Sequence, residues 1–543
     1  MLGMMMHKPL SIIDILIFAA DAYKLAGLVS VRTEGDIHRA TYTQTLARAA
    51  QLAHALKGLG VTEGDRVATL AWNGYRHFEL YFGIGGIGAV CHTINPRLSA
   101  EQLIYITHHA EDRLLFLDLT FAPLIEALAD KLPSDMRYVL MTDPAHMPDC
   151  KLPLLCYEEL LEGRPTHYDW PDLPEETACA LCYTSGTTGS PKGSLYSHRS
   201  TVLHALTTAL SIDLSLKEGA RVLPVVPLFH VNAWGLPFAA PLKGVSMVMP
   251  GPGLDGASLF LLMEAEQVTS AWGVPTVWLG LLGEMGKQGR KPKGLESIIV
   301  GGSAVPRTMI EQFENSAVAV CHAWGMTEMS PVGTHGMLSR EHKKLPFDTQ
   351  VTIKAKQGRR VFGVEMKIVD KEGQALPHDG VAAGELYVRG NTIIQAYYND
   401  DEASAKAFDR EGWFGTGDIA TIDSEGFMQI QDRAKDLIKS GGEWISSIDL
   451  ENIIMGHPKV ANCAVIAVPH PKWDERPLLV IVPAGAAHPE KAELDALLLK
   501  HVAKWQLPDA VEFVDALPLT ATGKVSKLTL RKQFSDYKLT DMF

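Results

Sequence analysis

Residues 183–193 read Tyr-Thr-Ser-Gly-Thr-Thr-Gly-Ser-Pro-Lys-Gly, and an apolar run, Ala178–Tyr183, leads directly into them. A helical pattern begins near Ser200, so the stretch is predicted to be a loop between a strand and a helix. Its three glycines allow backbone N–H groups to converge on a phosphate, its hydroxyls add donors, and Lys192 adds a positive charge. A surface turn needs neither the hydroxyls nor the lysine. The stretch therefore predicts a phosphate-binding loop, but not a Walker A loop, because Gly193 follows the lysine.

Around this loop, the first 430 or so residues alternate short apolar runs with helical patterns, which favours α/β units with mostly parallel sheets covered by helices. The apolar runs include Arg66–Ala71, Gly88–Thr93, Tyr138–Met141, Val222–Val226, Ser297–Val300 and Val318–Ala323, and the helical patterns include Thr43–Leu59, Ala100–His109 and Ser200–Leu210. From about 352 to 430 the runs become shorter and alternate, which predicts a small β-rich subdomain. We expect the large N-terminal domain to span 1–434.

A compact segment with its own apolar runs follows the charged residues 432–436, and we expect it to form a C-terminal α+β domain, 435–543. Its apolar runs are Cys463–Val468, Leu478–Val482 and Val511–Val514, and its predicted helices are Ser446–Met455 and Lys491–Lys504.

Composition excludes several classes of protein. The 543 residues carry a formal net charge of −13, which argues against a nucleic-acid binder that works by neutralising phosphates. No apolar run reaches the roughly 18 residues of a membrane span, and Ile12–Ala20 is interrupted by Asp14 and fits an amphipathic helix better than a signal peptide. Seven cysteines form no disulfide framework, and Cys179 and Cys182 are predicted to be structural. We therefore expect a cytoplasmic protein without integral membrane association.

Further residues with possible chemical roles follow two other apolar runs. After Val318–Cys321, the sequence Ala323-Trp-Gly-Met-Thr-Glu offers a flat ring for a nucleobase in Trp324, a hydroxyl for phosphate in Thr327 and a hard oxygen ligand for Mg²⁺ in Glu328. Alone, the tryptophan would more often belong to the core and the glutamate to the surface. After Ser297–Val300, a Gly-Gly-Ser turn lets the backbone approach a ligand closely.

Four other features allow two interpretations each. Asp418, in Gly-Thr-Gly-Asp, suits ribose hydroxyls but fits an Asx turn equally well. His230 lies in an otherwise apolar segment, Leu223–Gly235, where a core histidine is as reasonable as a ligand. The charged run Asp432–Lys439 could be a solvated linker, and Lys524, in a glycine-containing turn near the C-terminus, could be merely solvated.

Taken together, these motifs resemble those of the adenylate-forming acyl-CoA synthetases, which are related to luciferases and to peptide-synthetase adenylation domains. The resemblance covers nearly the whole chain, and its motifs occur in the family's order. The matching segments are 183–193 (phosphate loop), 223–235 (gate), 323–328 (adenine and magnesium), 415–418 (ribose), 432–446 (hinge) and 518–527 (terminal lysine). The sequence around them is similar to medium- and long-chain fatty acyl-CoA synthetases and to relatives that act on methylmercaptopropionate.

The resemblance implies a role for each matching residue. The nucleotide-binding and cofactor-binding residues would be Thr184, Ser185, Gly186, Thr187, Thr188, Gly189, Lys192, Gly301, Gly302, Ser303, His322, Ala323, Trp324, Gly325, Met326, Thr327, Asp418, Arg433, Lys439, Gly441 and Trp444. The substrate-binding residues would be His230, Val231, Trp234 and Gly302, with Trp234 gating the acyl tunnel. The metal ligands would be Thr184 and Glu328, and the catalytic residues Lys524, Thr184, Glu328, Lys435 and Lys439.

The implied reaction has two steps, in which a carboxylate attacks MgATP to form an acyl-adenylate and CoA then takes the acyl group. The C-terminal domain would be mobile and turn about Lys435 between the steps. A short- to medium-chain aliphatic acid is expected as the substrate, with Mg²⁺, ATP and CoA, and a homodimer is expected. An aryl- or branched-acid CoA ligase, an enzyme that passes the acyl group to a carrier protein, and a catalytically silent ATP-binding protein are the alternatives.

Overall fold

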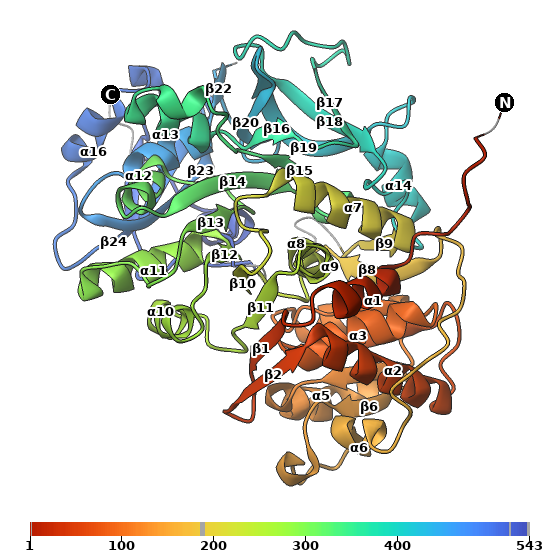
Figure 1. Ribbon diagram of the computed structural model, residues 1–543. Coiled ribbons are helices and arrows are strands. Elements are labelled where there is room, and N and C mark those ends of the chain that lie inside the picture. The colour runs from red at the N-terminus through yellow and green to blue at the C-terminus, as the bar shows by residue number, and fades with distance from the viewer. Residues whose placement is uncertain (2, 185–189, 442, 521–522, 540–543) are drawn as a thin grey trace.

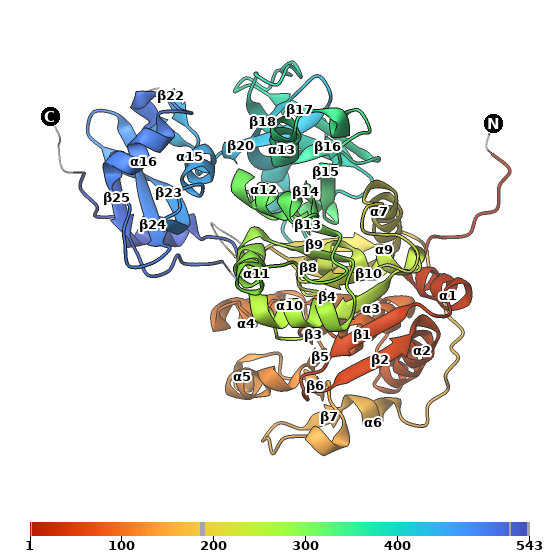
Figure 2. The same ribbon diagram turned by 60° about the vertical axis from the view of Figure 1, so that its left-hand side comes forward.

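A computed structural model of the 543-residue chain describes all residues except 2, 185–189, 442, 521–522 and 540–543. The chain forms two large sheets with their helices and a smaller C-terminal unit that lies to one side of them (Figures 1 and 2). The mixed α/β class expected from the sequence is confirmed. The described residues contain no helix long and apolar enough to cross a membrane.

The first sheet has seven strands, all parallel except the last, in the order β7 (Leu154–Cys156), β6 (Arg137–Leu140), β5 (Leu114–Leu117), β3 (Arg66–Leu70), β4 (Val90–Thr93), β8 (Ala178–Tyr183) and β9 (Gly193–Ser197). β9 runs antiparallel to β8, and the predicted phosphate loop connects these two strands. The apolar run Ala178–Tyr183 is therefore the first strand of a β-hairpin. The helix predicted near Ser200 begins after β9, at His198.

The second sheet has thirteen strands, and its members are β17 (Val364–Val369), β18 (Gly384–Gly390), β19 (Phe414–Ile422), β20 (Phe427–Arg433), β16 (Gly358–Arg360), β15 (Val332–His335), β14 (Ala319–Gly325), β13 (Ser297–Val300), β12 (Ser270–Gly273), β10 (Arg221–Pro224), β11 (Ser246–Met249), β1 (Gly27–Val31) and β2 (Ile37–Thr41). The strands from β14 to β1 are parallel, and those from β15 to β17 are antiparallel wherever they pair. The β-rich part of the chain thus continues the parallel sheet through β15.

Helices pack between and around the two sheets. They are α1 (Ile12–Ala22), α2 (Tyr42–Gly58), α3 (Tyr75–Gly86), α4 (Ala100–His109), α5 (Ala122–Leu128), α6 (Tyr157–Leu161), α7 (His198–Ser211), α9 (Leu236–Leu242), α10 (Gly256–Ala265), α11 (Pro275–Gln288), α12 (Arg307–Asn315), α13 (Phe347–Ala355) and α14 (Asp401–Ala407). Every residue of α3 is buried, because this helix contacts β4 and β8 of the first sheet and β1 of the second. Because no face of this helix meets solvent, its charged side chains Arg76 and Glu79 are paired, with Glu34 and Arg48 respectively.

The C-terminal unit is a five-stranded sheet with three helices. Its elements are β21 (Ile438–Ser440), β22 (Glu443–Ile445), α15 (Ser447–Ile454), β23 (Val460–His470), β24 (Asp474–Pro483), α16 (Lys491–Leu498), β25 (Ala510–Phe513) and α17 (Lys527–Gln533). The sequence prediction was wrong for the second helix, which ends at Leu498 and not at Lys504, where only a short 3-10 turn (Lys504–Gln506) follows.

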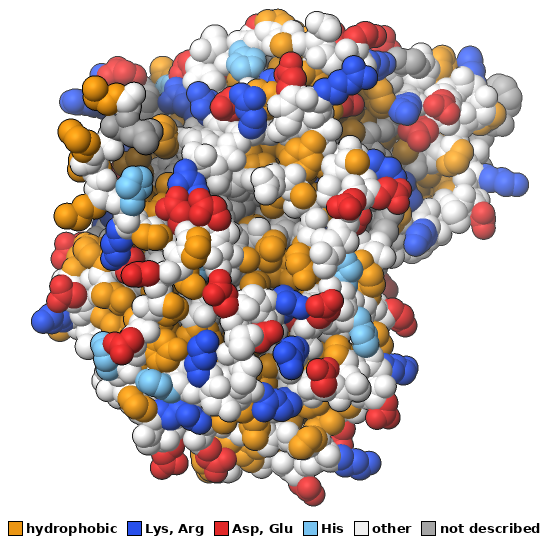
Figure 3. Space-filling view, turned by 90° about the vertical axis from the view of Figure 1, so that its right-hand side faces the viewer, with side chains coloured by type: hydrophobic (Ala, Val, Ile, Leu, Met, Phe, Trp, Pro, Cys, Tyr) orange, Lys and Arg blue, Asp and Glu red, His pale blue; other side chains and the backbone are white. Residues whose placement is uncertain are grey.

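Charge is distributed over the surface without a dominant basic region on the face drawn in Figure 3, where acidic and basic side chains are interspersed. Six of the seven cysteines are buried, and all seven are free. Burial raises the pKa of Cys179 to about 12 and that of Cys182 to about 11, so both thiols stay protonated. Such thiols are poor nucleophiles and metal ligands, which agrees with a structural role.

Candidate active site

The ribose end of the candidate site is built from residues of β14, β19 and β20, three strands of the second sheet. Trp324 Nε1 donates to Asp418 Oδ2 at 3.1 Å, and Arg433 Nε lies 3.0 Å from Asp418 Oδ1. Each carboxylate oxygen thus has one partner and keeps a lone pair for a ribose hydroxyl. Asp418 is only 2 % exposed, which the paired charge of Arg433 makes tolerable. The plain Asx turn therefore does not describe this aspartate.

The adenine motif differs in detail from its sequence prediction. β14 does not end at Cys321 but continues to Gly325, with an irregularity against β15 at Trp324/Gly325, so Ala323, Trp324 and Gly325 are strand residues. Met326 begins the turn that carries Thr327 and Glu328. The indole of Trp324 is held by Asp418 and is 8 % exposed, so its position is set before any nucleotide binds.

The phosphate end centres on Glu328, which the sequence predicts as a metal ligand. This carboxylate is 6 % exposed, and burial raises its pKa. Tyr397 donates its hydroxyl to Glu328 Oε1 at 2.8 Å, and Lys192 Nζ lies 4.9 Å from the centre of the Tyr397 ring. Sequence reasoning missed Tyr397, because it lies on the loop between β18 and α14 and no motif marks that loop. The contact brings the phosphate loop, the magnesium motif and this loop together.

The phosphate loop is described only at its two ends. Thr184 donates its backbone N–H to Lys192 O at 2.9 Å, and the Lys192 N–H donates to Thr184 Oγ1 at 3.3 Å. These two hydrogen bonds hold the two ends of the loop together. Ser185, Gly186, Thr187, Thr188 and Gly189 lie outside the described residues. Thr184 and Glu328 are a hydroxyl and a carboxylate, which are hard oxygen donors of the kind Mg²⁺ takes in small number while keeping waters and phosphate oxygens. Among the described residues there is no group of three or more His, Cys, Asp or Glu side chains that could hold a metal alone. The donors present therefore fit a magnesium ion brought by a nucleotide.

Lys524 reaches this site from the C-terminal unit. Its side chain lies beside Gly302, where an added Cβ would be 3.2 Å from Lys524 Cε, and Thr276 at the start of α11 donates to Gly523 O at 3.2 Å. In Figure 2 the chain after β25 extends toward α11. The pKa of Lys524 is lowered to about 8, chiefly by burial and also by the Arg433 charge, while the charges of Asp418 and Glu328 partly oppose that change. A solvated lysine would show none of this.

The gate segment has an unusual backbone. Val231, Asn232, Ala233 and Trp234 have φ between 47° and 58°, and Gly235 follows at 79°. This turn, labelled α8 (Val231–Trp234), is therefore left-handed, which costs roughly 1–2 kcal/mol for each residue with a side chain. The Trp234 indole packs against Gly301 and is 7 % exposed. His230 is near Lys524, and burial lowers its pKa to about 3, so it is neutral.

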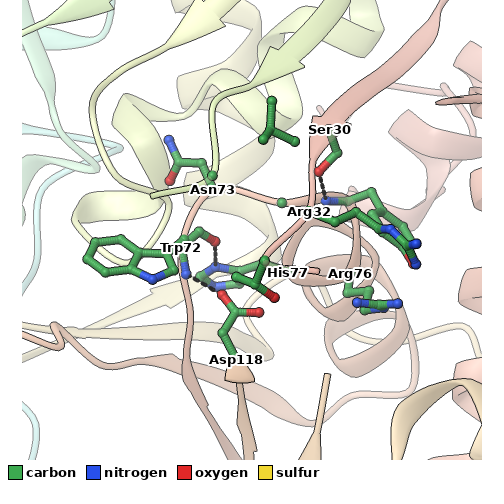
Figure 4. A pocket seen from close by; sticks show the side chains of 12 residues that line it. Ser30, Arg32, Trp72, Asn73, Arg76, His77 and Asp118 are labelled. Atoms are coloured by element: carbon green, nitrogen blue, oxygen red, sulfur yellow. Dashed lines mark hydrogen bonds between the residues drawn. The ribbon is translucent and has the colours of Figure 1, made fainter. Parts of the chain in front are cut away.

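The segment that leads into the gate is fixed from the first sheet. Asn73 donates to Pro224 O at 2.7 Å and to Val226 O at 3.0 Å, and accepts from Leu228 N–H at 2.6 Å. Asn73 borders a hollow at the carboxyl ends of β3 and β5 (Figure 4), where Asp118 accepts from Trp72 N–H at 2.7 Å. Burial raises the pKa of Asp118 to about 7.

Several other residues that the sequence predicts for the site do not lie close to Lys524. Lys439, Gly441 and Trp444 lie in the β21–β22 hairpin, at the end of the C-terminal unit away from α11 (Figure 2). Lys435 lies between β20 and β21. The ring of His322, a residue of β14, is buried, and its Nδ1 lies 3.1 Å from the carbonyl oxygen of Ala355 at the end of α13. Ser303 follows the glycine turn after β13.

Comparison with known proteins identifies the family to which the chain belongs. Residues 18–398 match the model of the AMP-binding enzyme family, and 449–524 match the AMP-binding enzyme C-terminal domain. The chain belongs to the AMP-binding enzymes. This AMP-binding enzyme is 50 % identical to the 3-methylmercaptopropionyl-CoA ligase of Ruegeria lacuscaerulensis, over 99 % of each chain. It is 48 % identical to the medium-chain-fatty-acid–CoA ligase of Ectopseudomonas oleovorans, over 99 % of this chain and 98 % of that one.

Its fold is also found among solved structures. The crystal structure of the anthranilate CoA ligase AuaEII in complex with anthranoyl-AMP superimposes with a TM-score of 0.87 at 25 % sequence identity, and the match covers 98 % of both chains. The family and the fold predicted from the phosphate loop and its companion motifs are therefore confirmed.

Proposed function

We propose that this AMP-binding enzyme joins a short- to medium-chain aliphatic carboxylic acid to coenzyme A through an acyl-adenylate. The reaction class is that of its relatives, so the chain is an AMP-forming acid–thiol ligase. The observation that carries the proposed chemistry is the convergence of Lys524 with Asp418, Arg433 and Glu328. A cationic side chain held beside a nucleotide site is what a transition state with developing phosphate charge requires.

In the first step a carboxylate oxygen of the acid attacks the α-phosphorus of ATP, the bond to the β-phosphate breaks, and pyrophosphate leaves. Asp418 and Arg433 would hold the ribose, and Trp324 would border the adenine. Lys524, protonated, would bind the carboxylate and an α-phosphate oxygen and stabilise the charge that develops between them. No side-chain nucleophile takes part, so the rate enhancement comes from positioning and electrostatics.

Glu328 and Thr184 would hold the Mg²⁺ that accompanies ATP, with Tyr397 orienting the carboxylate. Bound there, the ion would neutralise phosphate charge. Because burial raises the Glu328 pKa and the Tyr397 hydroxyl opposes that rise, the hydrogen bond favours the ionised form that a cation needs.

In the second step the CoA thiol attacks the acyl carbon and AMP leaves. Lys524 would first withdraw as the C-terminal unit turns about Lys435, and the β21–β22 hairpin would approach in its place. Support for a binding role of this hairpin comes from Trp444, which is 40 % exposed and has Lys439 Nζ at 5.4 Å and Lys371 Nζ at 5.7 Å from its ring centre. An exposed aromatic ring between two lysines suits a ligand that carries phosphates and a base.

The acid would lie between His230, Val231, Trp234 and Gly302. These residues are apolar or neutral, which favours an aliphatic tail over a charged one. The names of the relatives support this class, since they specify methylmercaptopropionate, medium-chain and long-chain fatty acids at 47–50 % identity. An aromatic acid is the second candidate, because the structure with anthranoyl-AMP has the same fold.

The test is pyrophosphate release with MgATP across linear acids from C3 to C16, methylmercaptopropionate and benzoate, with and without CoA. We expect CoA-dependent turnover with a maximum among the short- and medium-chain acids. A maximum with benzoate would support the aryl-acid alternative, and turnover that does not require CoA would support transfer to a carrier protein. The homodimer stays a prediction, which sedimentation of the full chain tests.

A further inference from the structure

The left-handed gate turn, Val231–Gly235, requires something to hold it. Residues with side chains adopt this conformation singly, and a run of four is retained only where the surroundings determine it. Strain of this kind also makes a segment able to change conformation, since an alternative backbone lowers its energy. The contacts around the turn therefore show what holds it in this conformation.

On its N-terminal side, the turn begins where three buried side chains fix the preceding residues. Besides Asn73, Tyr81 donates its hydroxyl to Leu228 O at 2.6 Å, and Thr93 donates to Phe229 O at 3.2 Å. All three come from the first sheet and its helix α3. Any movement of the gate is thereby confined to the residues after Phe229.

On its C-terminal side, the turn is held by His204 of α7. The ring of His204 occupies the space beside Gly235, where an added Cβ would be 2.6 Å from both Nδ1 and Cε1. Its other nitrogen, Nε2, accepts the backbone N–H of Val332 at 3.0 Å. The histidine is 2 % exposed, and burial lowers its pKa to about 3, so the ring is neutral with its proton on Nδ1.

His204 thus joins the gate to the nucleotide side of the site. Val332 is the first residue of β15, four residues after Glu328, and β15 pairs with β14 next to Trp324. The imidazole is fixed by one strand of the nucleotide site and packs against the glycine that ends the gate turn. Removing the ring would leave Gly235 free to rotate and the four strained residues free to relax.

We propose that His204 is a positioning residue that keeps the gate turn left-handed and so sets how far an acid can extend past Trp234. This inference rests on the proposed role of Trp234 as the gate. It assigns acid selection partly to a side chain on α7 that faces Gly235, outside the motifs that the sequence marks.

The experiment compares kcat/KM for octanoate and for butyrate in the full-length enzyme. In His204→Ala we expect the octanoate-to-butyrate ratio to rise about 5- to 10-fold, because the closed turn loses its support, while KM for MgATP stays unchanged. Thr201→Ala is the matched control, since Thr201 is a buried polar residue one turn earlier on α7 whose hydroxyl lies 3.4 Å from Cys179 Sγ and does not face the gate. Equal loss of activity with both acids would show a merely structural role and overturn the proposal.

Ala233→Gly tests the same proposal by stabilising the left-handed turn, where His204→Ala would destabilise it. Its result does not depend on whether the His204 variant folds. Glycine accepts positive φ without strain, so the closed turn is stabilised and the ratio should fall several-fold. An unchanged ratio in Ala233→Gly would overturn the proposal.

Trp234→Ala separates this inference from the proposed function. If Trp234→Ala changes the octanoate-to-butyrate ratio but neither His204→Ala nor Ala233→Gly does, the gating role of Trp234 is supported and the role of His204 is refuted. If Trp234→Ala leaves the ratio unchanged, both the gate and the inference that rests on it are refuted.

Discussion

At the scale of single residues, the site depends on side chains whose charge is controlled by burial. Glu328 and Asp418 are buried and Lys524 is half-buried, and each has an opposite charge or a hydrogen-bond donor nearby. Burial lowers the pKa of Lys524 to about 8, so its protonation state responds to pH in the range where enzymes are assayed, and burial raises the pKa of Glu328 above its ordinary value. Three predictions follow at this scale.

Lys524→Ala should remove adenylation but spare thioester formation from acyl-adenylate that is supplied ready-made. We expect the adenylation rate to fall by about two to three orders of magnitude, because a preorganised cation at the reacting phosphate is lost. Single-turnover assays of the two half-reactions measure this directly. Equal loss in both half-reactions would contradict the assignment of Lys524 to the first step.

The pH dependence of adenylation should follow Lys524. Because burial lowers its pKa to about 8, the charged form predominates below that pH and is lost as the pH rises through it. We therefore expect kcat/KM for pyrophosphate release to decline above about pH 8. Lys524→Arg keeps its charge throughout, so the decline should be absent from whatever activity this variant retains; a decline at the same pH would assign it to another group.

Tyr397→Phe should weaken MgATP binding. The hydroxyl donates to Glu328 at 2.8 Å and lowers the pKa of that carboxylate, so its loss leaves a buried carboxylate more readily protonated. We expect KM for MgATP to rise about 3- to 10-fold, with a smaller effect at high pH, where Glu328 ionises regardless. Tyr398→Phe, at the neighbouring position, is the control. Unchanged Mg²⁺ titrations in Tyr397→Phe would show that the hydrogen bond has no part in metal binding.

At the scale of elements, the gate is positioned by contacts between segments that belong to different sheets. Asn73 follows β3 of the first sheet and binds three backbone groups at the end of β10 of the second sheet and in the segment after it. The side chain is 4 % exposed, so water cannot readily replace it. The two sheets are thus joined by a polar contact in addition to their apolar packing around α3.

Asn73→Ala should destabilise the N-terminal domain. Two carbonyls and one N–H lose their partner in a buried place, which we expect to lower the free energy of unfolding by about 2–4 kcal/mol. Denaturant unfolding followed by tryptophan fluorescence measures this. Thr33→Ala is the control, because Thr33 borders the same hollow and its side chain makes only one hydrogen bond among the described residues, to Glu34. This variant should change the free energy of unfolding little. Equal stability of the two variants would contradict the anchoring role.

At the scale of the whole molecule, several contacts join the N-terminal domain to the C-terminal unit, and one of them lies beside the proposed hinge. Asp432, which precedes Lys435, accepts from Ser447 N–H at 2.7 Å and from Ser447 Oγ at 2.6 Å, although Ser447 begins α15 of the C-terminal unit. Lys527 of α17 also binds Ser447 Oγ, at 2.5 Å. A rotation about Lys435 must rearrange this contact, so the contact favours the arrangement in which Lys524 reaches the nucleotide site.

Asp432→Asn should shift the balance between the two half-reactions. We expect adenylation to slow and thioester formation from supplied acyl-adenylate to accelerate, each by about 3- to 10-fold, because a hydrogen bond to a charged group holds one arrangement only. Asp436→Asn is the control, since Asp436 pairs with Arg531 at 2.6 Å on the same side of the hinge and its contact does not cross it. Parallel changes in both half-reactions would refute the proposed role of this contact.

The local sequence was sufficient to predict the α/β class, the phosphate loop and most strands. An apolar run of four to six residues forms a buried strand wherever the chain places it, so β3, β6 and β13 could be predicted within a residue or two. The order and spacing of the motifs were sufficient to predict the family, because each motif supplies one part of a nucleotide site. Predicted boundaries were wrong where propensity was ambiguous, as at the end of α16 and at Cys321, where β14 continues.

Tertiary structure alone decided the partners within the site. Three hydrogen bonds join residues that are far apart in the sequence: Tyr397 to Glu328 over 69 residues, Trp324 to Asp418 over 94, and Val332 to His204 over 128. No local pattern encodes such pairs, because a tyrosine or histidine has the same propensity whether it fills a core or orients a ligand. The left-handed gate turn has the same origin: Val231, Ala233 and Trp234 avoid positive φ on their own, and the packing of His204 and the anchored segment before them overrides that preference.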